Sequence, residues 1–261
     1  MDIKLIACDL DGTLLPEGAM SGSKEDFELI RALQQRGIIF APTSGRPYGN
    51  IRRTLYPVAD DLFYICDNGA NVVYHDRVIY REPMDQKLAF ELIDCINAMG
   101  EEYESVICTA DNYVLMPKRD KTVIDILRCW NMSVRIAKDK EHIIDPILKY
   151  TMYMGDGLDW ATVERLTNEW SGKVKHISVA GNTWLDFQDG DKGSALLRSL
   201  EFLGIAPENV IAFGDNYNDI GMLDTAGYSY AVSHAADDVK KHADAVCGSV
   251  QEVLREILAG T

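Results

Sequence analysis

The sequence predicts an α/β protein: a core with a parallel β-sheet, interrupted by an inserted α+β unit with an antiparallel sheet and helices. Three observations support this fold class. Residues 1–82 and residues 188–261 both alternate short apolar segments with amphipathic segments of helical period. The region between them, residues 83–187, pairs strand-like segments across short turns and mixes them with helices. Because the alternation resumes after this region, both ends of the chain are expected to form one domain into which the middle is inserted.

The first part of the chain begins with a buried strand. Residues 3–10 (IKLIACDL) are rich in aliphatic and β-branched side chains, which favours a short strand inside a core. Residues 21–37 have an amphipathic helical pattern, with Ser21 or Ser23 as N-cap and Gly37 as C-terminal stop. The elements expected next are a strand at 38–45, a short helix at 46–56 with Pro47 near its first turn, a strand at 62–70 and a hairpin around residues 75–77.

The inserted region is expected to contain three helices and an antiparallel sheet. In order, we expect a helix at 85–100, a hairpin at 105–116 around Asp111–Asn112, a helix at 120–130, a strand at 147–155, a helix at 159–172 capped by Asp159, and a hairpin at 173–188 around Gly181–Asn182.

The last part of the chain returns to alternating helices and strands. We expect helices at 192–204, 218–227, 236–243 and 250–260, with strands at 209–215 and 228–233 between them.

Composition limits the classes of function. The 261-residue chain has a net charge of −15, which disfavours nucleic acid and anionic membranes as partners. No segment reaches the ~18 consecutive apolar residues of a membrane span, and no signal peptide is evident at the N-terminus. The six cysteines are scattered without a C-x-x-C pair, as expected for buried thiols in a reducing cytosol. We therefore expect a cytoplasmic protein.

Polar side chains collect where the predicted parallel strands end. Asp9 and Asp11 follow the first strand and Ser44 follows the second, and ligands bind at this edge of open parallel sheets. Two carboxylates at the end of a buried strand repel each other and are costly to bury unless a partner offsets their charge. Three further residues come after the apolar part of the next strand, NVIAF at 209–213, and a lysine opens the helix before it: Asp215, Asn218, Asp219 and Lys192. The sequence thus predicts one site assembled from four separate segments.

The composition of this predicted site indicates its chemistry. Several carboxylates around one point require a cation, and oxygen ligands without histidine or cysteine favour Mg²⁺. Ser44, the backbone of Gly45 and Lys192 would supply donors for phosphate oxygens. A metal, phosphate donors and an exposed carboxylate together suggest phosphoryl transfer through an aspartyl-phosphate intermediate.

Four motifs in these segments resemble those of the haloacid dehalogenase superfamily, and more narrowly of its Cof-type phosphatases. They are DLDGT at 9–13, TSGR at 43–46, KG at 192–193 and GDNYND at 214–219, with supporting similarity in DNGA from 67 and in the segment from 222. The resemblance implies a Rossmann-like core at 1–82 and 188–261 and an inserted α+β cap at 83–187. It also implies a magnesium-dependent hydrolase of small phosphate monoesters, such as a sugar phosphate or pyridoxal phosphate.

Where residues match the motifs, the resemblance implies their roles. Asp9 would be the nucleophile, Asp11 would act as general acid and then general base, and Lys192 would orient Asp9 and neutralise phosphate charge. Phosphate contacts are expected from the Leu10 amide, Ser44, Gly45, Arg46, Lys192 and Asn218. The metal ligands would be Asp9, the backbone carbonyl of Asp11, Asp215 and Asp219.

Alternatives remain at the level of residues and of function. Ser44 could cap the following helix, Lys192 could be a surface lysine, Asp219 could cap the following helix instead of binding metal, and Arg46 could lie on the surface. Asn68 and Gly69 are expected to form a turn that holds the site. A phosphomutase of the phosphomannomutase type, or a non-catalytic phosphate-binding protein, is the alternative function. The expected partner is a small phosphorylated metabolite, and the chain would be a monomer or homodimer.

Overall fold

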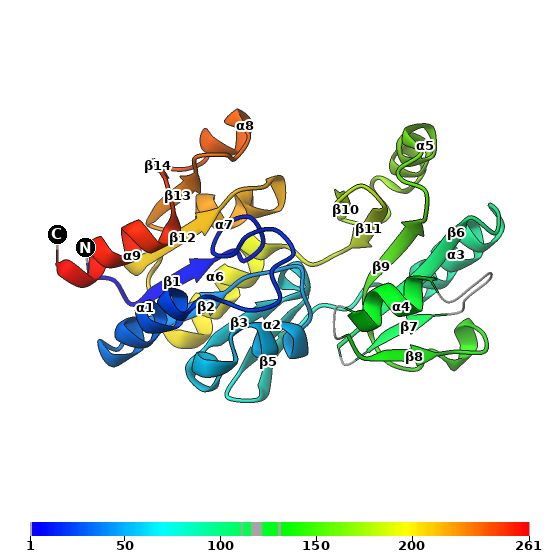
Figure 1. Cartoon of the computed structure of the whole chain (residues 1–261). Helices are drawn as coiled ribbons and strands as arrows, with labels where there is room; N and C mark the ends of the chain where they lie inside the picture. The colour runs from blue at the N-terminus through cyan, green and yellow to red at the C-terminus, as the bar shows by residue number, and fades with distance from the viewer. Residues whose placement is uncertain (1, 111, 116–121, 130–131, 261) are drawn as a thin grey trace. The chain divides into compact units, whose positions relative to one another are not determined.

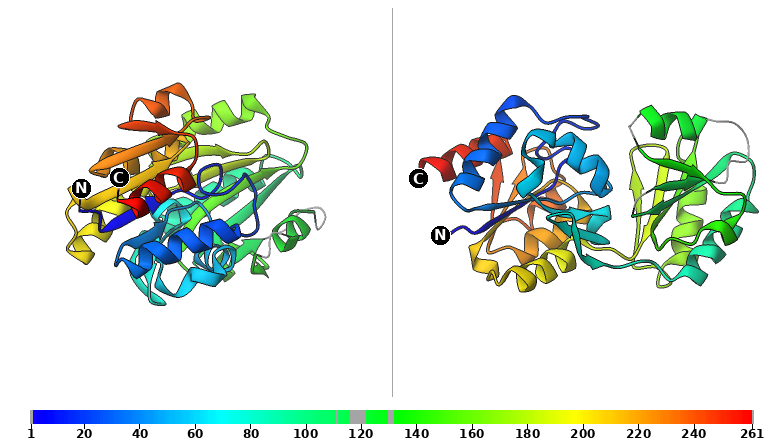
Figure 2. Two further views of the ribbon diagram at one scale, coloured as in Figure 1. Left: turned by 60° about the vertical axis from the view of Figure 1, so that its left-hand side comes forward. Right: turned by 90° about the horizontal axis from the view of Figure 1, so that it is seen from below.

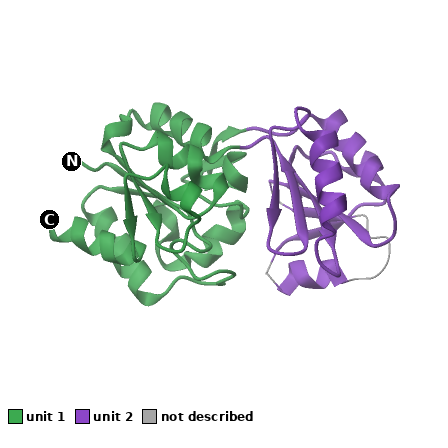
Figure 3. Ribbon diagram, turned by 90° about the horizontal axis from the view of Figure 1, so that it is seen from above, with its two compact units in different colours: residues 1–81, 191–261 green, residues 82–190 purple. Residues whose placement is uncertain are grey.

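The structure is a computed structural model and describes residues 2–110, 112–115, 122–129 and 132–260. The chain divides into two compact units (Figure 3), Met1–Arg81 with Asp191–Thr261 and Glu82–Gly190. The expected boundaries, after residues 82 and 187, lie within three residues of these. That the units are separate folding domains stays a prediction.

Unit 1 is built on a parallel sheet, which confirms the predicted fold class. Among the described residues its order is β14–β13–β12–β1–β2, and every neighbouring pair is parallel. The strands are β1 (Leu5–Cys8), β2 (Ile39–Pro42), β12 (Val210–Gly214), β13 (Tyr228–Val232) and β14 (Ala245–Cys247). β1 and β12 are buried along their whole length, as their apolar sequences predict. The short strand β14 was not expected.

A smaller antiparallel sheet continues the parallel one beyond β2. It contains β3 (Phe63–Cys66), β4 (Asn71–Tyr74) and β5 (Arg77–Arg81). A parallel bridge between Thr43 and Ile65 joins β3 to the end of β2. The expected hairpin is present: His75 and Asp76, both with positive φ, form the turn between β4 and β5.

Helices cover both faces of the parallel sheet (Figure 2). α1 (Lys24–Gln35) and α9 (Val250–Ala259) pack together on one face, while α6 (Lys192–Leu203) and α7 (Ile220–Thr225) pack together on the other. The shorter helices are α2 (Tyr48–Thr54) and α8 (Asp237–Lys240) (Figure 1). Buried apolar side chains from both layers form one core around β1 and β12. Because all five strands run parallel, their carboxyl ends lie at one edge of the sheet.

Helix ends in unit 1 follow the capping signals of the sequence. Ser23 caps α1: its hydroxyl accepts from the Asp26 amide at 3.1 Å, and the Asp26 carboxylate accepts from the Ser23 amide at 2.7 Å. The Nε2 of Gln251, on α9, donates to the same Asp26 side chain at 2.7 Å. The cap of α1 therefore also joins the two helices on this face.

Unit 2 contains a sheet with helices, as predicted for the inserted region. Its order is β10–β11–β9–β6–β7–β8, antiparallel except for the β7–β8 pair. β7 and β8 are parallel because α4 crosses over between them. The elements are α3 (Gln86–Asn97), β6 (Tyr103–Thr109), β7 (Tyr113–Leu115), α4 (Thr122–Cys129), β8 (Val134–Ile136), β9 (Ile147–Met154), α5 (Trp160–Trp170), β10 (His176–Ala180) and β11 (Trp184–Gln188).

Most expected elements of the insert are present. Asp159 caps α5 through the Ala161 amide at 3.2 Å, and residues 181–183 connect β10 to β11. Asp111 in the turn of the expected first hairpin, and residues 120, 121 and 130 of the expected helix at 120–130, lie outside the described residues. β8 was not expected. Among the described residues, no helix is both long and apolar enough to span a membrane.

Candidate active site

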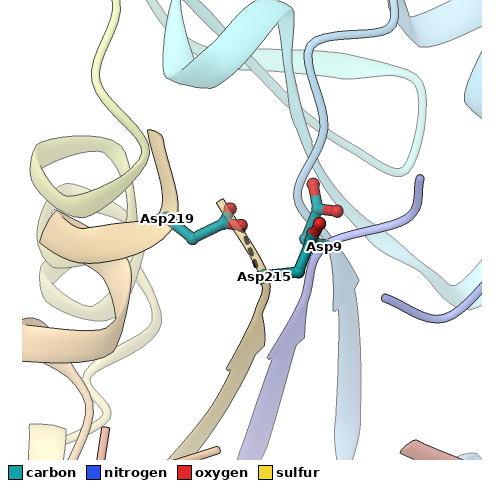
Figure 4. A group of neighbouring side chains, drawn as sticks. All are labelled: Asp9, Asp215 and Asp219. Carbon is teal, nitrogen blue, oxygen red and sulfur yellow. Dashed lines mark hydrogen bonds between the residues drawn. The ribbon is translucent and has the colours of Figure 1, made fainter. Parts of the chain in front are cut away.

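Three aspartates from two segments meet at the carboxyl edge of the parallel sheet (Figure 4). Asp9 directly follows β1, Asp215 directly follows β12, and Asp219 closes the turn after Asp215. The Asp9 amide donates to the Phe213 carbonyl at 3.0 Å, so the ends of β1 and β12 stay in register. One carboxylate oxygen from each aspartate lies within 4.8 Å of the others. The sequence prediction that these acids converge is therefore correct.

Lys192 lies between two of these carboxylates. It is the first residue of α6 and is only 1% exposed, so the alternative of a surface lysine is wrong. Its Nζ donates to Asp9 Oδ1 and to Asp219 Oδ1, both at 2.6 Å. Burial lowers the pKa of Lys192, but Asp219 and Asp9 together outweigh this and raise it above its ordinary value. Lys192 is thus held as a cation inside the site.

The remaining negative charge of the cluster is only partly balanced. Burial raises the pKa of Asp9 well above its usual range; Lys192 opposes this shift, while Asp219 and Asp215 reinforce it. Burial is also the main cause of the raised pKa of Asp215, opposed by a hydrogen bond from Thr13 and reinforced by Asp219. A divalent cation bound by oxygen would favour the ionised form of both groups. The donor set therefore fits Mg²⁺, with Asp9 and Asp215 as the carboxylates best placed to hold it.

Asp219 uses both of its oxygens in holding the loop. While Oδ1 accepts from Lys192, Oδ2 accepts from the amides of Asp215 and Asn216, each at 3.0 Å. The side chain is fully buried; it takes part in the capping box of the turn Tyr217–Asp219, whose N-cap is Asn216, and makes no capping hydrogen bond to α7. A Cβ on Gly214 would lie 2.5 Å from the Asp219 Cβ, so glycine is required there. The geometry favours a supporting role for Asp219, and direct metal binding by it stays a prediction.

Asp11 and Arg46 form a pair. Arg46 Nε donates to Asp11 Oδ2 at 2.7 Å, and its Nη2 donates to Asp11 Oδ1. Arg46 also donates to the Ala19 carbonyl at 2.8 Å and to Asn50 and Thr54 at 3.2 and 3.1 Å. Arg46 is therefore engaged with its own unit and not a free surface residue, and its expected contact with phosphate stays a prediction. The Asp11 side chain lies outside the three-aspartate cluster, so metal binding by Asp11 still depends on its backbone carbonyl.

The predicted phosphate loop lies beside the cluster. Ser44 is 2% exposed, its amide donates to the Ile65 carbonyl at 2.9 Å, and its hydroxyl accepts from the Arg46 amide at 3.2 Å. The N-cap of α2 is Pro47, without a side-chain hydrogen bond, so the alternative role of Ser44 as the cap of α2 is wrong. Leu10 is fully buried, whereas Asn218 is exposed. The binding roles of these residues stay predictions.

Further contacts in the site, in addition to the Arg46–Asp11 pair, were not identified from the sequence. Thr13 donates to Asp215 Oδ1 at 2.7 Å, and a Cβ on Gly12 would lie 2.7 Å from Asp215 Oδ2. Asn218 Nδ2 donates to Asn68 Oδ1 at 3.1 Å. Thr13 stands in the DLDGT segment and Asn68 in the DNGA segment, so the signal was present as a motif position without an assigned contact.

Comparison with known proteins identifies the family. The model of the haloacid dehalogenase-like hydrolases matches residues 6–257. The chain is 24% identical to the 5-amino-6-(5-phospho-D-ribitylamino)uracil phosphatase YbjI of Escherichia coli, over 95% of this chain and 92% of the relative. It is 29% identical to the pyridoxal phosphate phosphatase YbhA of the same organism, over 95% and 94%. A crystal structure from Eubacterium rectale shares 28% identity with a TM-score of 0.88, covering 98% of this chain and all of the other. As its four motifs predicted, the chain belongs to the haloacid dehalogenase-like hydrolases.

Proposed function

We propose that the protein is a magnesium-dependent phosphatase that hydrolyses small phosphate monoesters through an aspartyl phosphate on Asp9. The observation that carries the proposal is the buried Lys192, which bridges Asp9 and Asp219 at 2.6 Å with Asp215 close by. The phosphatases YbjI and YbhA, named for two small phosphorylated metabolites, support the reaction and the size of the substrate. The cytoplasmic location and the choice between monomer and homodimer stay predictions.

The contacts of Asp9 support different roles for its two carboxylate oxygens. Oδ1 accepts the hydrogen bond from Lys192, so we assign the attack on phosphorus to Oδ2. Lys192 holds the carboxylate in place during attack and offsets the charge of the transferring group. Bound Mg²⁺ would supply additional positive charge to the phosphoryl oxygens. Donors from the Ser44–Gly45 loop and Asn218 would hold those oxygens.

Asp11 would transfer the proton. It would protonate the leaving oxygen and later accept a proton from the water that attacks the aspartyl phosphate. In the structure its two carboxylate oxygens are bound by Arg46. Because each carboxylate oxygen has a second lone pair, the proton that Asp11 transfers would occupy a position that Arg46 leaves open.

The test is phosphate release from a panel of phosphate esters that includes sugar phosphates and pyridoxal phosphate, with Mg²⁺ and with EDTA. Wild-type protein is expected to release phosphate only with the metal, and Asp9→Asn is expected to lose this activity while keeping its thermal unfolding transition. Normal activity in a folded Asp9→Asn variant would exclude the aspartyl intermediate. Conversion of a sugar phosphate to its isomer without release would instead indicate a mutase.

A further inference from the structure

A single short turn packs against two of the four segments that form the site. This turn, η2 (Asp67–Gly69), follows β3. The Asp67 amide donates to the Arg46 carbonyl at 3.1 Å, and the Asn68 amide donates to the Ser44 carbonyl at 3.0 Å. A Cβ on Gly69 would lie 2.3 Å from the carbonyl oxygen of Asp191, the residue before Lys192. η2 therefore packs against both the predicted phosphate loop and the start of α6.

The side chain of Asn68 extends this connection to a third segment, the loop after β12. It is 5% exposed, and its Oδ1 accepts the hydrogen bond from Nδ2 of the exposed Asn218. The amide of Asn68 also occupies the space beside Gly45, because a Cβ there would lie 3.1 Å from Asn68 Oδ1. Asn68 thus lies between the phosphate loop and the loop that carries Asn218.

The backbone of Asn68 explains why the connection requires this residue type. Its φ and ψ are 51° and 36°, in the left-handed region that asparagine and glycine tolerate better than other residues. Asparagine combines this conformation with a short side-chain acceptor. Glycine at this position would keep the backbone conformation but remove the side-chain acceptor. A substitution by glycine therefore tests the acceptor separately from the backbone conformation.

We propose that Asn68 is a positioning residue that acts through Asn218. By accepting one hydrogen of the Asn218 Nδ2, it fixes the plane of that amide and leaves the second hydrogen for a phosphate oxygen. A solvent-exposed asparagine would otherwise rotate freely and lose side-chain entropy on binding phosphate. This inference rests on the proposed function, since it assigns phosphate binding to Asn218.

The test is a double-mutant cycle on Asn68→Gly and Asn218→Ala, with KM, kcat and the inhibition constant of inorganic phosphate as readouts. Each single variant is expected to raise KM and the phosphate constant roughly 10-fold, the effect of losing one hydrogen bond to a charged group, with much less change in kcat. The KM and phosphate inhibition constant of the double variant are expected to be no higher than those of Asn218→Ala, because both changes remove the same interaction. His75→Gly, at another position with positive φ, is the control for introducing glycine.

A second variant distinguishes positioning from a general effect on folding. Asn68→Asp keeps an acceptor oxygen and tolerates the left-handed conformation, as the neighbouring Asp67 with φ of 51° shows. In this background Asn218→Ala is still expected to raise the phosphate constant roughly 10-fold, because the tether to Asn218 remains. The comparison of Asn68→Asp with and without Asn218→Ala can be made even if the Asn68→Gly variant does not fold.

The outcomes separate the inference from the proposed function. Additive losses in the Asn68→Gly cycle, or no cost of Asn218→Ala in the Asn68→Asp background, would overturn the role of Asn68. If wild-type protein releases no phosphate but binds it in a calorimetric titration, the same cycle on binding constants tests Asn68 alone. If wild-type protein neither releases nor binds phosphate, both the proposed function and the inference are wrong.

Discussion

At the scale of single residues, Arg46 is the position where two roles can be separated. It was expected to bind phosphate, yet its guanidinium holds Asp11 through two hydrogen bonds and also binds Asn50, Thr54 and Ala19. If Arg46 controls the placement of Asp11, its loss will affect proton transfer. If it binds phosphate directly, its loss will affect phosphate affinity.

We expect Arg46→Lys to lower kcat about 10-fold or more, within the range that general acid–base catalysis contributes. The kcat should fall because lysine cannot reproduce the two hydrogen bonds that Arg46 makes with Asp11. The inhibition constant of inorganic phosphate should change little, because lysine keeps the positive charge. Steady-state kinetics with phosphate as competitive inhibitor measures both quantities. A large rise in the phosphate constant with unchanged kcat would instead make Arg46 a phosphate ligand.

The residues of the site differ in how far sequence could place them. Asp9 and Asp215 are adjacent to strands, so the periodicity of two parallel strands was enough to bring them together. The contact of Arg46 with Asp11 could not be predicted in this way, because it depends on side-chain torsions across 35 positions of the chain. The same holds for Asn68 and Asn218, which are separated by 150 positions.

At the scale of elements, α6 packs closely on α7 beside Lys192. A Cβ added to Gly193 would come 2.4 Å from the carbonyl carbon of Gly221, so at this point the backbones of the two helices approach through two glycines. The contact involves backbone atoms on both sides and cannot be relieved by rotating a side chain. Because Gly193 directly follows Lys192, a shift of α6 here would also move the lysine from its carboxylates.

Gly193→Ala is therefore expected to destabilise the protein by about 1–3 kcal/mol, as overpacking does elsewhere, and to lower kcat. The control is Gly37→Ala, which introduces strain at φ of +75° but meets no atom within 4 Å. It should cost about 1 kcal/mol without loss of activity. Urea unfolding and kcat measured on both variants check the pair. Equal activity of the two folded variants would show that the α6–α7 contact does not position Lys192.

Long periodic elements were predictable, and the shortest ones were not. The helices α1 and α6, of 12 residues each, and the buried strand β12 have apolar patterns that extend over more residues than the few by which predicted element ends are uncertain. β8 and β14 have three residues each, too few to show a period of two. They are strands because a neighbouring strand offers its edge, which is a property of the tertiary structure.

At the scale of the whole molecule, the insertion was visible because two kinds of pattern alternate along one chain. β1 and β12 are separated by about 200 positions and still pair in register, Leu5 opposite Val210 and Cys8 opposite Phe213. Composition alone could not show this pairing. The pairing of β1 with β12 followed from placing two buried strands in one sheet. The β7–β8 pair is parallel in an otherwise antiparallel sheet, and it depends on a crossover that the hydrophobic pattern of the sequence did not resolve.

The buried aspartate cluster of Asp9, Asp215 and Asp219 predicts how the stability of the whole protein depends on pH and on metal. The folded-state pKa values of Asp9 and Asp215 are raised above the unfolded value of about 3.9. Between the unfolded-state pKa and the raised folded-state pKa of each of these groups, the folded state binds more protons than the unfolded state. Their contribution to stability is therefore present below about pH 4 and is lost as pH rises through the raised pKa values.

In EDTA, we expect the melting temperature of the wild-type protein, relative to Asp215→Asn, to fall as pH rises from 4 to 7. At pH 7, Mg²⁺ should reverse this loss, because it binds the ionised carboxylates of the folded state; at about 100 times its dissociation constant it would add about 2.7 kcal/mol. Asp215→Asn should show a smaller pH dependence and a smaller shift with Mg²⁺, since it lacks one titrating group and one ligand. Differential scanning calorimetry at matched ionic strength, with NaCl replacing MgCl₂ in the control, separates metal binding from general screening. Identical pH and Mg²⁺ responses in the two proteins would show that Asp215 neither titrates in this range nor binds the ion.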